Sequence, residues 1–94
     1  MDIWKLQRLR NTDAFIKNGI LRIYYYGEEI AEISGDNVIL TLVQKTHMTK
    51  IRLNQISKVL ELGYRVYQKG KHWNILLSDG SSYSMGSKVK FERD

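Results

Sequence analysis

The side chains best suited to bind an anion lie together in one short stretch, residues 45–54 (KTHMTKIRLN). Two threonine hydroxyls, an amide and three cations gather there, at the point where an amphipathic helix is expected to begin. The first turn of a helix exposes unpaired N–H groups at the positive end of the helix dipole. Hydroxyl and basic side chains in that position suit an anion such as phosphate. The stretch therefore predicts binding and does not indicate a reaction.

Within this expected helix, Lys50, Asn54 and Lys58 fall at i, i+4 and i+8 and share one face. A row of this kind can lie along a phosphate backbone, with Thr46 and Thr49 at its start. The alternative is an ordinary solvated face, which is what such rows usually form.

Aromatic and basic residues are also interleaved in one expected strand, residues 22–26, and in a later expected hairpin, residues 65–73. Aromatic rings on a sheet can stack on exposed bases while lysine and arginine contact phosphates, as in proteins that bind single strands. Alternatively, these rings belong to the core, since tyrosine and tryptophan are common in strands. The candidate binding residues are Thr46, Thr49, Lys50, Asn54, Lys58, Arg65, Tyr67, Lys69 and Lys71.

Motifs for catalysis, metals and nucleotides are missing from the sequence. His47 and His72 have no nucleophile or metal-ligand pattern around them, and there is no cysteine. Glu28 and Glu29 are adjacent strand residues and point to opposite faces. The glycines are too far apart for a phosphate-binding loop. We therefore expect a protein that is not an enzyme and needs no cofactor or metal.

The net charge of +5 favours acidic partners, nucleic acid first and acidic protein surfaces second. The alternative is that the charge only keeps a small domain in solution. The absence of cysteine fits a reducing, intracellular location. The N-terminus lacks the apolar region of a signal peptide, and no stretch reaches the roughly 18 apolar residues of a membrane span. We expect no membrane contact.

The 94 residues, of which 43% are apolar, predict a single domain of the α+β class. Residues 20–26, 28–34 and 38–44 predict an antiparallel β-meander, and the last of these strands is apolar on both faces, as a doubly covered strand would be. One amphipathic helix is expected at about residues 49–62, capped by Thr49 and ended by Gly63. Residues 64–68, 72–77 and 81–85 predict a second hairpin or meander.

The two ends of the chain are less strongly patterned. Ile3, Leu6 and Leu9 share a face in a short N-terminal helix. Asn18-Gly19 indicates either a β-hairpin turn or the end of a helical turn, and the second interpretation is slightly favoured. Residues 86–94 predict either a short strand or a frayed tail.

Three segments resemble small uncharacterised proteins encoded by bacteriophages. Residues 24–31 (YYYGEEIA) are similar to an aromatic-x-Tyr-x-x-x-Ile-Ala strand pair, and residues 46–54 to a Ser/Thr-rich approach to a helix. Residues 63–69 with Trp73 resemble the closing hairpin of those proteins. The resemblance implies a phage origin, the host cytoplasm, and the order meander, helix, hairpin. It implies no activity, and Met48-Thr49 stands where those proteins have paired threonines.

Three functions follow as hypotheses. The first is a small non-enzymatic accessory protein that binds nucleic acid. The second is a phage modulator that covers an acidic surface of a host or anti-phage-defence protein. The third is self-association, as a homodimer, through open sheet edges, because the chain has no proline to protect them.

Overall fold

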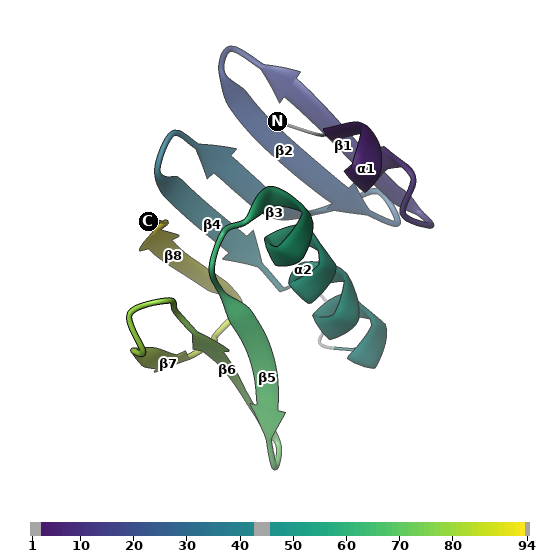
Figure 1. Ribbon diagram of the computed structural model, residues 1–94. Coiled ribbons are helices and arrows are strands. Elements are labelled where there is room, and N and C mark those ends of the chain that lie inside the picture. Colours follow the sequence, from purple (N-terminus) through teal and green to yellow (C-terminus); the bar gives the residue numbers. More distant parts are fainter. Residues whose placement is uncertain (1–2, 43–45, 94) are drawn as a thin grey trace.

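The computed structural model describes residues 3–42 and 46–93 and has the predicted α+β architecture (Figure 1). It contains two antiparallel sheets, a short N-terminal helix and a longer helix between the sheets in sequence. The elements are α1 (Ile3–Gln7), β1 (Thr12–Lys17), β2 (Ile20–Tyr25), β3 (Glu28–Ser34), β4 (Asn37–Thr41), α2 (His47–Leu60), β5 (Arg65–Lys69), β6 (His72–Leu76), β7 (Ser82–Ser84) and β8 (Lys88–Glu92).

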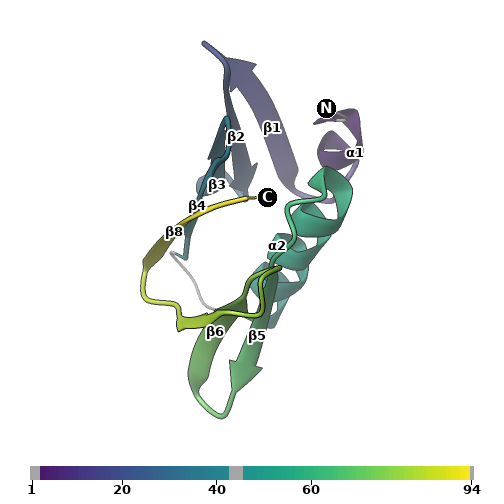
Figure 2. The ribbon, with the colours of Figure 1, turned by 60° about the vertical axis from the view of Figure 1, so that its left-hand side comes forward.

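The larger sheet has the strand order β1-β2-β3-β4-β8, and the smaller sheet the order β5-β6-β7. The chain leaves the larger sheet after β4, forms α2 and the smaller sheet, and returns to pair β8 with β4. Both helices lie on the same side of the larger sheet (Figure 2). The core forms on that side, where Ile23 and Leu40 of the sheet belong to one buried cluster with Leu53 of α2 and Ile75 of β6.

The N-terminal hairpin corrects one sequence expectation. Residues 15–20 form a β-hairpin and not the favoured helical turn, because Lys17 pairs with Ile20 around Asn18-Gly19. Both turn residues have positive φ, 54° and 77°, which is the pattern of a type I′ turn and suits asparagine followed by glycine.

The C-terminal segment takes the strand alternative, since residues 88–92 pair along the whole of β4. Its apolar residues Val89 and Phe91 pack against the core. The expectation that β4 is covered on both faces is wrong. Val38 and Leu40 are buried on the side of the sheet that the helices cover. Ile39 points to the opposite side, which neither helix covers, and is only half-buried.

Helix α2 begins and ends earlier than predicted. Thr46 and not Thr49 is its N-cap, because the Thr46 side chain accepts a hydrogen bond from the backbone N–H of Thr49 at 3.1 Å. At the other end, Glu61 takes the left-handed conformation with φ 54°, two residues before the expected Gly63.

Tyr64 ties α2 to the smaller sheet and gives an expected pH dependence. Its buried hydroxyl donates to the carbonyl of Leu53 at 2.6 Å, and burial raises the pKa of the phenol far above its ordinary value near 10. Only the unfolded chain then ionises this group as the pH rises past 10. The free energy of unfolding should fall there by up to about 1.4 kcal/mol per pH unit from this residue.

Urea unfolding between about pH 8 and pH 11 measures this dependence. The variant Tyr64→Phe should show a shallower alkaline loss, whereas Tyr83→Phe, which changes an exposed tyrosine, should follow the parent chain. Equal slopes in all three proteins would contradict the assignment.

Candidate functional site

The two predicted hydroxyls close the start of α2. Thr46 Oγ1 lies 2.9 Å from Thr49 Oγ1 and also accepts from the Thr49 N–H. Thr49 is buried, whereas Thr46 is exposed. These threonines therefore cap the helix, and their hydrogen bonds are already made within the chain.

The predicted row along α2 is interrupted at Asn54. Its amide nitrogen donates to the carbonyl of Val66 at 2.9 Å, and its amide oxygen accepts from the Val66 N–H at 2.7 Å. Lys58 is exposed and Lys50 is half-buried, but the amide between them faces strand β5. The structure therefore does not bring Asn54 together with the two lysines, because both ends of its amide are bonded to β5.

Ser57 repeats this contact one helical turn further on. Its hydroxyl donates to the carbonyl of Tyr64 at 2.6 Å and accepts from the Tyr64 N–H at 3.1 Å. Asn54 and Ser57 together pair α2 with the backbone of residues 64 and 66, along the outer edge of the smaller sheet. This occupies an edge that would otherwise be open for pairing with another chain.

The outer edge of the larger sheet is also contacted by a helix. The amide nitrogen of Gln7, at the end of α1, donates to the carbonyl of Ala14 in the edge strand β1 at 2.9 Å. The edge strand β8 carries Lys88 and Lys90, and charges of this kind discourage pairing between edges.

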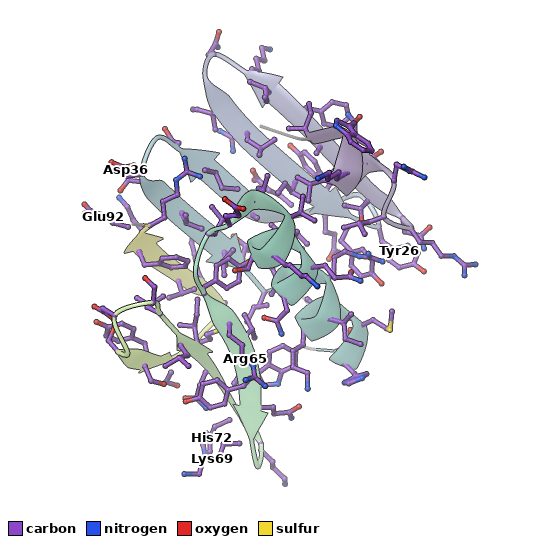
Figure 3. All side chains as sticks on the ribbon, in the orientation of Figure 1. Tyr26, Asp36, Arg65, Lys69, His72 and Glu92 are labelled. Atoms are coloured by element: carbon purple, nitrogen blue, oxygen red, sulfur yellow. The ribbon has the colours of Figure 1, made fainter. Side chains whose placement is uncertain are left out.

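Four of the predicted binding residues do come together, on the β5–β6 hairpin. Arg65, Tyr67 and Lys69 occupy alternate positions of β5 and so point to one face, and Lys71 lies in the turn. The register places His72 directly opposite Lys69. Figure 3 shows the side chains of Arg65, Lys69 and His72 projecting around this hairpin, away from the larger sheet.

The side chain of Tyr67 lies across this face of the smaller sheet. Its hydroxyl is 2.7 Å from Ser82 Oγ, although Tyr67 is on β5, Ser82 is on β7, and β6 runs between them. Neighbouring strands are about 4.8 Å apart, so the side chain must lie along the sheet surface to reach over the middle strand. The ring is half-buried and covers β6.

We call this surface the hairpin face. It carries three cations, a tyrosine and a histidine, and every other side chain that the strand register places on it is neutral. No carboxylate belongs to it among the described residues. Its members are Arg65, Tyr67, Lys69, His72, Asn74, Leu76, Ser82 and Ser84, together with Lys71 from the turn at the end of the hairpin.

The tyrosine-rich strand β2 is organised differently from this hairpin. Arg22 forms ion pairs with Glu29 and Glu32, and the hydrogen bond that its guanidinium donates to Glu29 is the main cause of the raised pKa of the guanidinium. Tyr24 contacts Phe15 edge to face, with ring centroids 6.1 Å apart. The cation on this strand is thus engaged by carboxylates, and the strand does not offer the free charge of the hairpin face.

A pocket of about 550 Å³ lies where the β2–β3 turn meets the start of α2. Two segments that are far apart in the sequence line this pocket. Thr46 and Thr49, two of the predicted binding residues, lie there beside Tyr25 and Tyr26, a proximity that the sequence does not predict. Its lining residues are Tyr25, Tyr26, Glu28, Ile30, Thr46, Met48 and Thr49.

Behind the pocket, Arg52 of α2 is buried and stacks on Tyr25, its guanidinium carbon 5.3 Å from the ring centroid. It also donates to the side chain of Gln55 and to the carbonyl of Arg10. Tyr25 in turn contacts Tyr26 edge to face, with centroids 4.8 Å apart. A buried cation and two rings therefore contact one another in series, ending at the exposed ring of Tyr26.

Tyr26 has an unfavourable backbone conformation. It occupies the first position of a two-residue turn with φ 52°, followed by Gly27 with φ 76°, and its side chain is 68% exposed. This type I′ pattern favours asparagine or glycine, and a bulky residue there costs about 1 kcal/mol. Backbone strain of this kind is concentrated at functional sites.

The substitution Tyr26→Asn is therefore expected to stabilise the fold by about 1 kcal/mol, a rise of about 4–8 °C in Tm. Thermal unfolding followed by circular dichroism measures the change. The reciprocal variant Asn18→Tyr, at the equivalent position of the β1–β2 hairpin with φ 54°, should lose a similar amount. A lower Tm for Tyr26→Asn would show that the ring stabilises the turn by packing.

The fold and these two surfaces define a small α+β domain with a free basic face on one sheet and a tyrosine-lined pocket beside its main helix. No family model matches the chain, and the comparisons with curated proteins and with solved structures find no match either. Neither helix in the described part of the chain is long and apolar enough to cross a membrane. Residues 3–42 and 46–93 contain no cluster of three metal-ligating side chains.

Proposed function

We propose that this protein is a small phage-type accessory protein that acts without catalysis and binds single-stranded nucleic acid through the hairpin face. The observation that carries the proposal is the grouping of Arg65, Lys69 and Lys71 around a partly exposed Tyr67, on a face without carboxylates. The cations would contact phosphates, and the ring would stack on a base.

A single strand suits this face better than a duplex. In a duplex the face of each base is covered by the neighbouring base pairs, so a tyrosine ring cannot stack on it, whereas every unpaired base offers a stacking surface. The diagonal hydrogen bond to Ser82 fixes the Tyr67 side chain before binding, which lowers the entropy lost when a base is bound.

The test is fluorescence anisotropy with labelled single-stranded DNA, single-stranded RNA and duplex DNA over a series of salt concentrations. We expect micromolar binding of a single strand at about 50 mM salt and a slope of about −2 in log K against log salt, since each of three phosphate contacts contributes about 0.7. Absence of binding to all three probes at this salt concentration would overturn the proposal.

The hairpin face also supports a second candidate function, a modulator that binds a host or anti-phage-defence protein. A basic surface without carboxylates complements an acidic patch on such a protein. Pulldown from host lysate with and without nuclease separates the two functions. A partner that survives nuclease supports host modulation, and loss of all bound material supports nucleic-acid binding.

A further inference from the structure

The pocket between the β2–β3 turn and α2 has the chemistry of a base-binding site. Tyr25 and Tyr26 supply aromatic surface, and Ile30 and Met48 supply apolar contacts. Pockets of 300–1,000 Å³ with mainly apolar walls and a few polar groups are typical sites for small molecules. Glu28 is the charged side chain among the described lining residues.

The carboxylate of Glu28 is an acceptor without a donor. It is exposed and makes no hydrogen bond or ion pair with any residue in the described ranges. Glu28 is directly opposite Tyr25 in the β2–β3 register, so the two side chains leave the sheet on the same face. An ionised carboxylate accepts hydrogen bonds only, and its two oxygens can pair with two adjacent N–H groups.

The ring surface next to this acceptor is already ordered. The stack from Arg52 through Tyr25 to Tyr26 leaves the last ring largely exposed, and the strained backbone of Tyr26 places it there. A planar ligand that stacks on an exposed ring while donating two hydrogen bonds to Glu28 uses both features. Guanine has this chemistry, because its ring N–H and its exocyclic amine are adjacent donors on one edge.

Charge distinguishes guanine from the other flat donor of two hydrogen bonds, an arginine side chain. A guanidinium ion entering the pocket would meet the buried guanidinium of Arg52 behind Tyr25 and the positive end of the α2 dipole. It would also enter a chain of net charge +5. A neutral base meets none of this repulsion, so the geometry points to a guanine base as the ligand of this pocket, supplied either by a free nucleotide or by an unpaired position of a strand.

This inference does not depend on the hairpin face, because a nucleoside without phosphate tests the pocket alone. Isothermal titration with guanosine, inosine and adenosine should give the order guanosine, inosine, adenosine. Inosine keeps the ring N–H and lacks the amine, and adenosine lacks the ring N–H. Loss of one good bidentate pair should weaken binding about 10- to 100-fold.

Two variants and one control complete the test. Glu28→Gln should lose the preference for guanosine by about 10-fold or more, and Tyr26→Asn, which is expected to fold more stably, should lose binding through loss of the ring. Glu92→Gln removes the same charge from β8, on the far side of the molecule from Tyr26 in Figure 3, and should bind like the parent chain.

Equal affinity for guanosine and adenosine, or unchanged binding by Glu28→Gln, would overturn the inference. Tighter binding of arginine amide than of guanosine would assign the pocket to a basic side chain and would also overturn it. The source of the base is decided with a chain whose hairpin cations are replaced by alanine. If this chain binds guanosine monophosphate but not a strand with one unpaired guanine, the source is a free nucleotide; if it also binds the strand, the source is an unpaired base.

Discussion

Replacing Arg65, Lys69 and Lys71 together by alanine is expected to weaken binding of single-stranded nucleic acid about 10²- to 10³-fold at about 50 mM salt. Three phosphate contacts on a single strand contribute about 2 to the slope of log K against log salt, because each contact releases condensed counterions. The residual slope of the variant should therefore be close to zero. Fluorescence anisotropy at several salt concentrations measures the affinity and the slope together.

The matched control removes three cations from the other sheet, Lys17, Lys88 and Lys90, all of which are exposed. Both triple variants lower the net charge from +5 by three, to +2, so the long-range field changes equally. The control should keep most of the affinity and most of the slope. Equal losses in the two variants would show that binding follows net charge and that the hairpin face has no special part in it.

The order of the elements from β2 to β7 could be predicted because each depends on a local pattern. The β5–β6 strands alternate apolar and polar residues, so the sequence places Val66, Trp73 and Ile75 on the buried face and the cations on the other. The hairpin face follows directly from that alternation, with the turn at Gly70-Lys71 fixing which residues pair.

The interior of the candidate site could not be predicted in this way. Thr46 and Thr49 have the same hydroxyl chemistry three residues apart, and helix-start rules suit either of them as the cap. The pocket joins Tyr25 and Tyr26 with the start of α2 through tertiary packing, which leaves no periodic signal in the sequence. The sequence pattern also gives no sign that Arg52, one of the three cations of residues 45–54, is buried against Tyr25.

Asn54 shows why a polar residue on a helix face need not face solvent, and it gives the largest expected effect on stability. The substitution Asn54→Ala leaves both the N–H and the carbonyl of Val66 without their partner from α2. Each unpaired group costs about 1–3 kcal/mol when it stays away from water, so a loss of about 2–6 kcal/mol is expected from the two groups together. For a domain of this size that lowers Tm by more than about 10 °C, measured by thermal or urea unfolding.

The control Lys58→Ala changes an exposed residue one turn away on the same helix and should stay within about 0.5 kcal/mol of the parent chain.

Asn54→Asp separates the two hydrogen bonds, because a carboxylate can still accept from the Val66 N–H but cannot donate to its carbonyl. It should therefore also destabilise the fold, since a carboxylate oxygen then faces the partly negative carbonyl oxygen of Val66. A different result would contradict this account. If Asn54→Ala were as stable as the parent chain and lost affinity for nucleic acid, Asn54 would contact the nucleic acid, as the sequence analysis predicts for this face of α2. The two hydrogen bonds to Val66 argue for the opposite result. We expect the folded fraction of Asn54→Ala to be smaller, and the folded molecules to bind nucleic acid with the affinity of the parent chain.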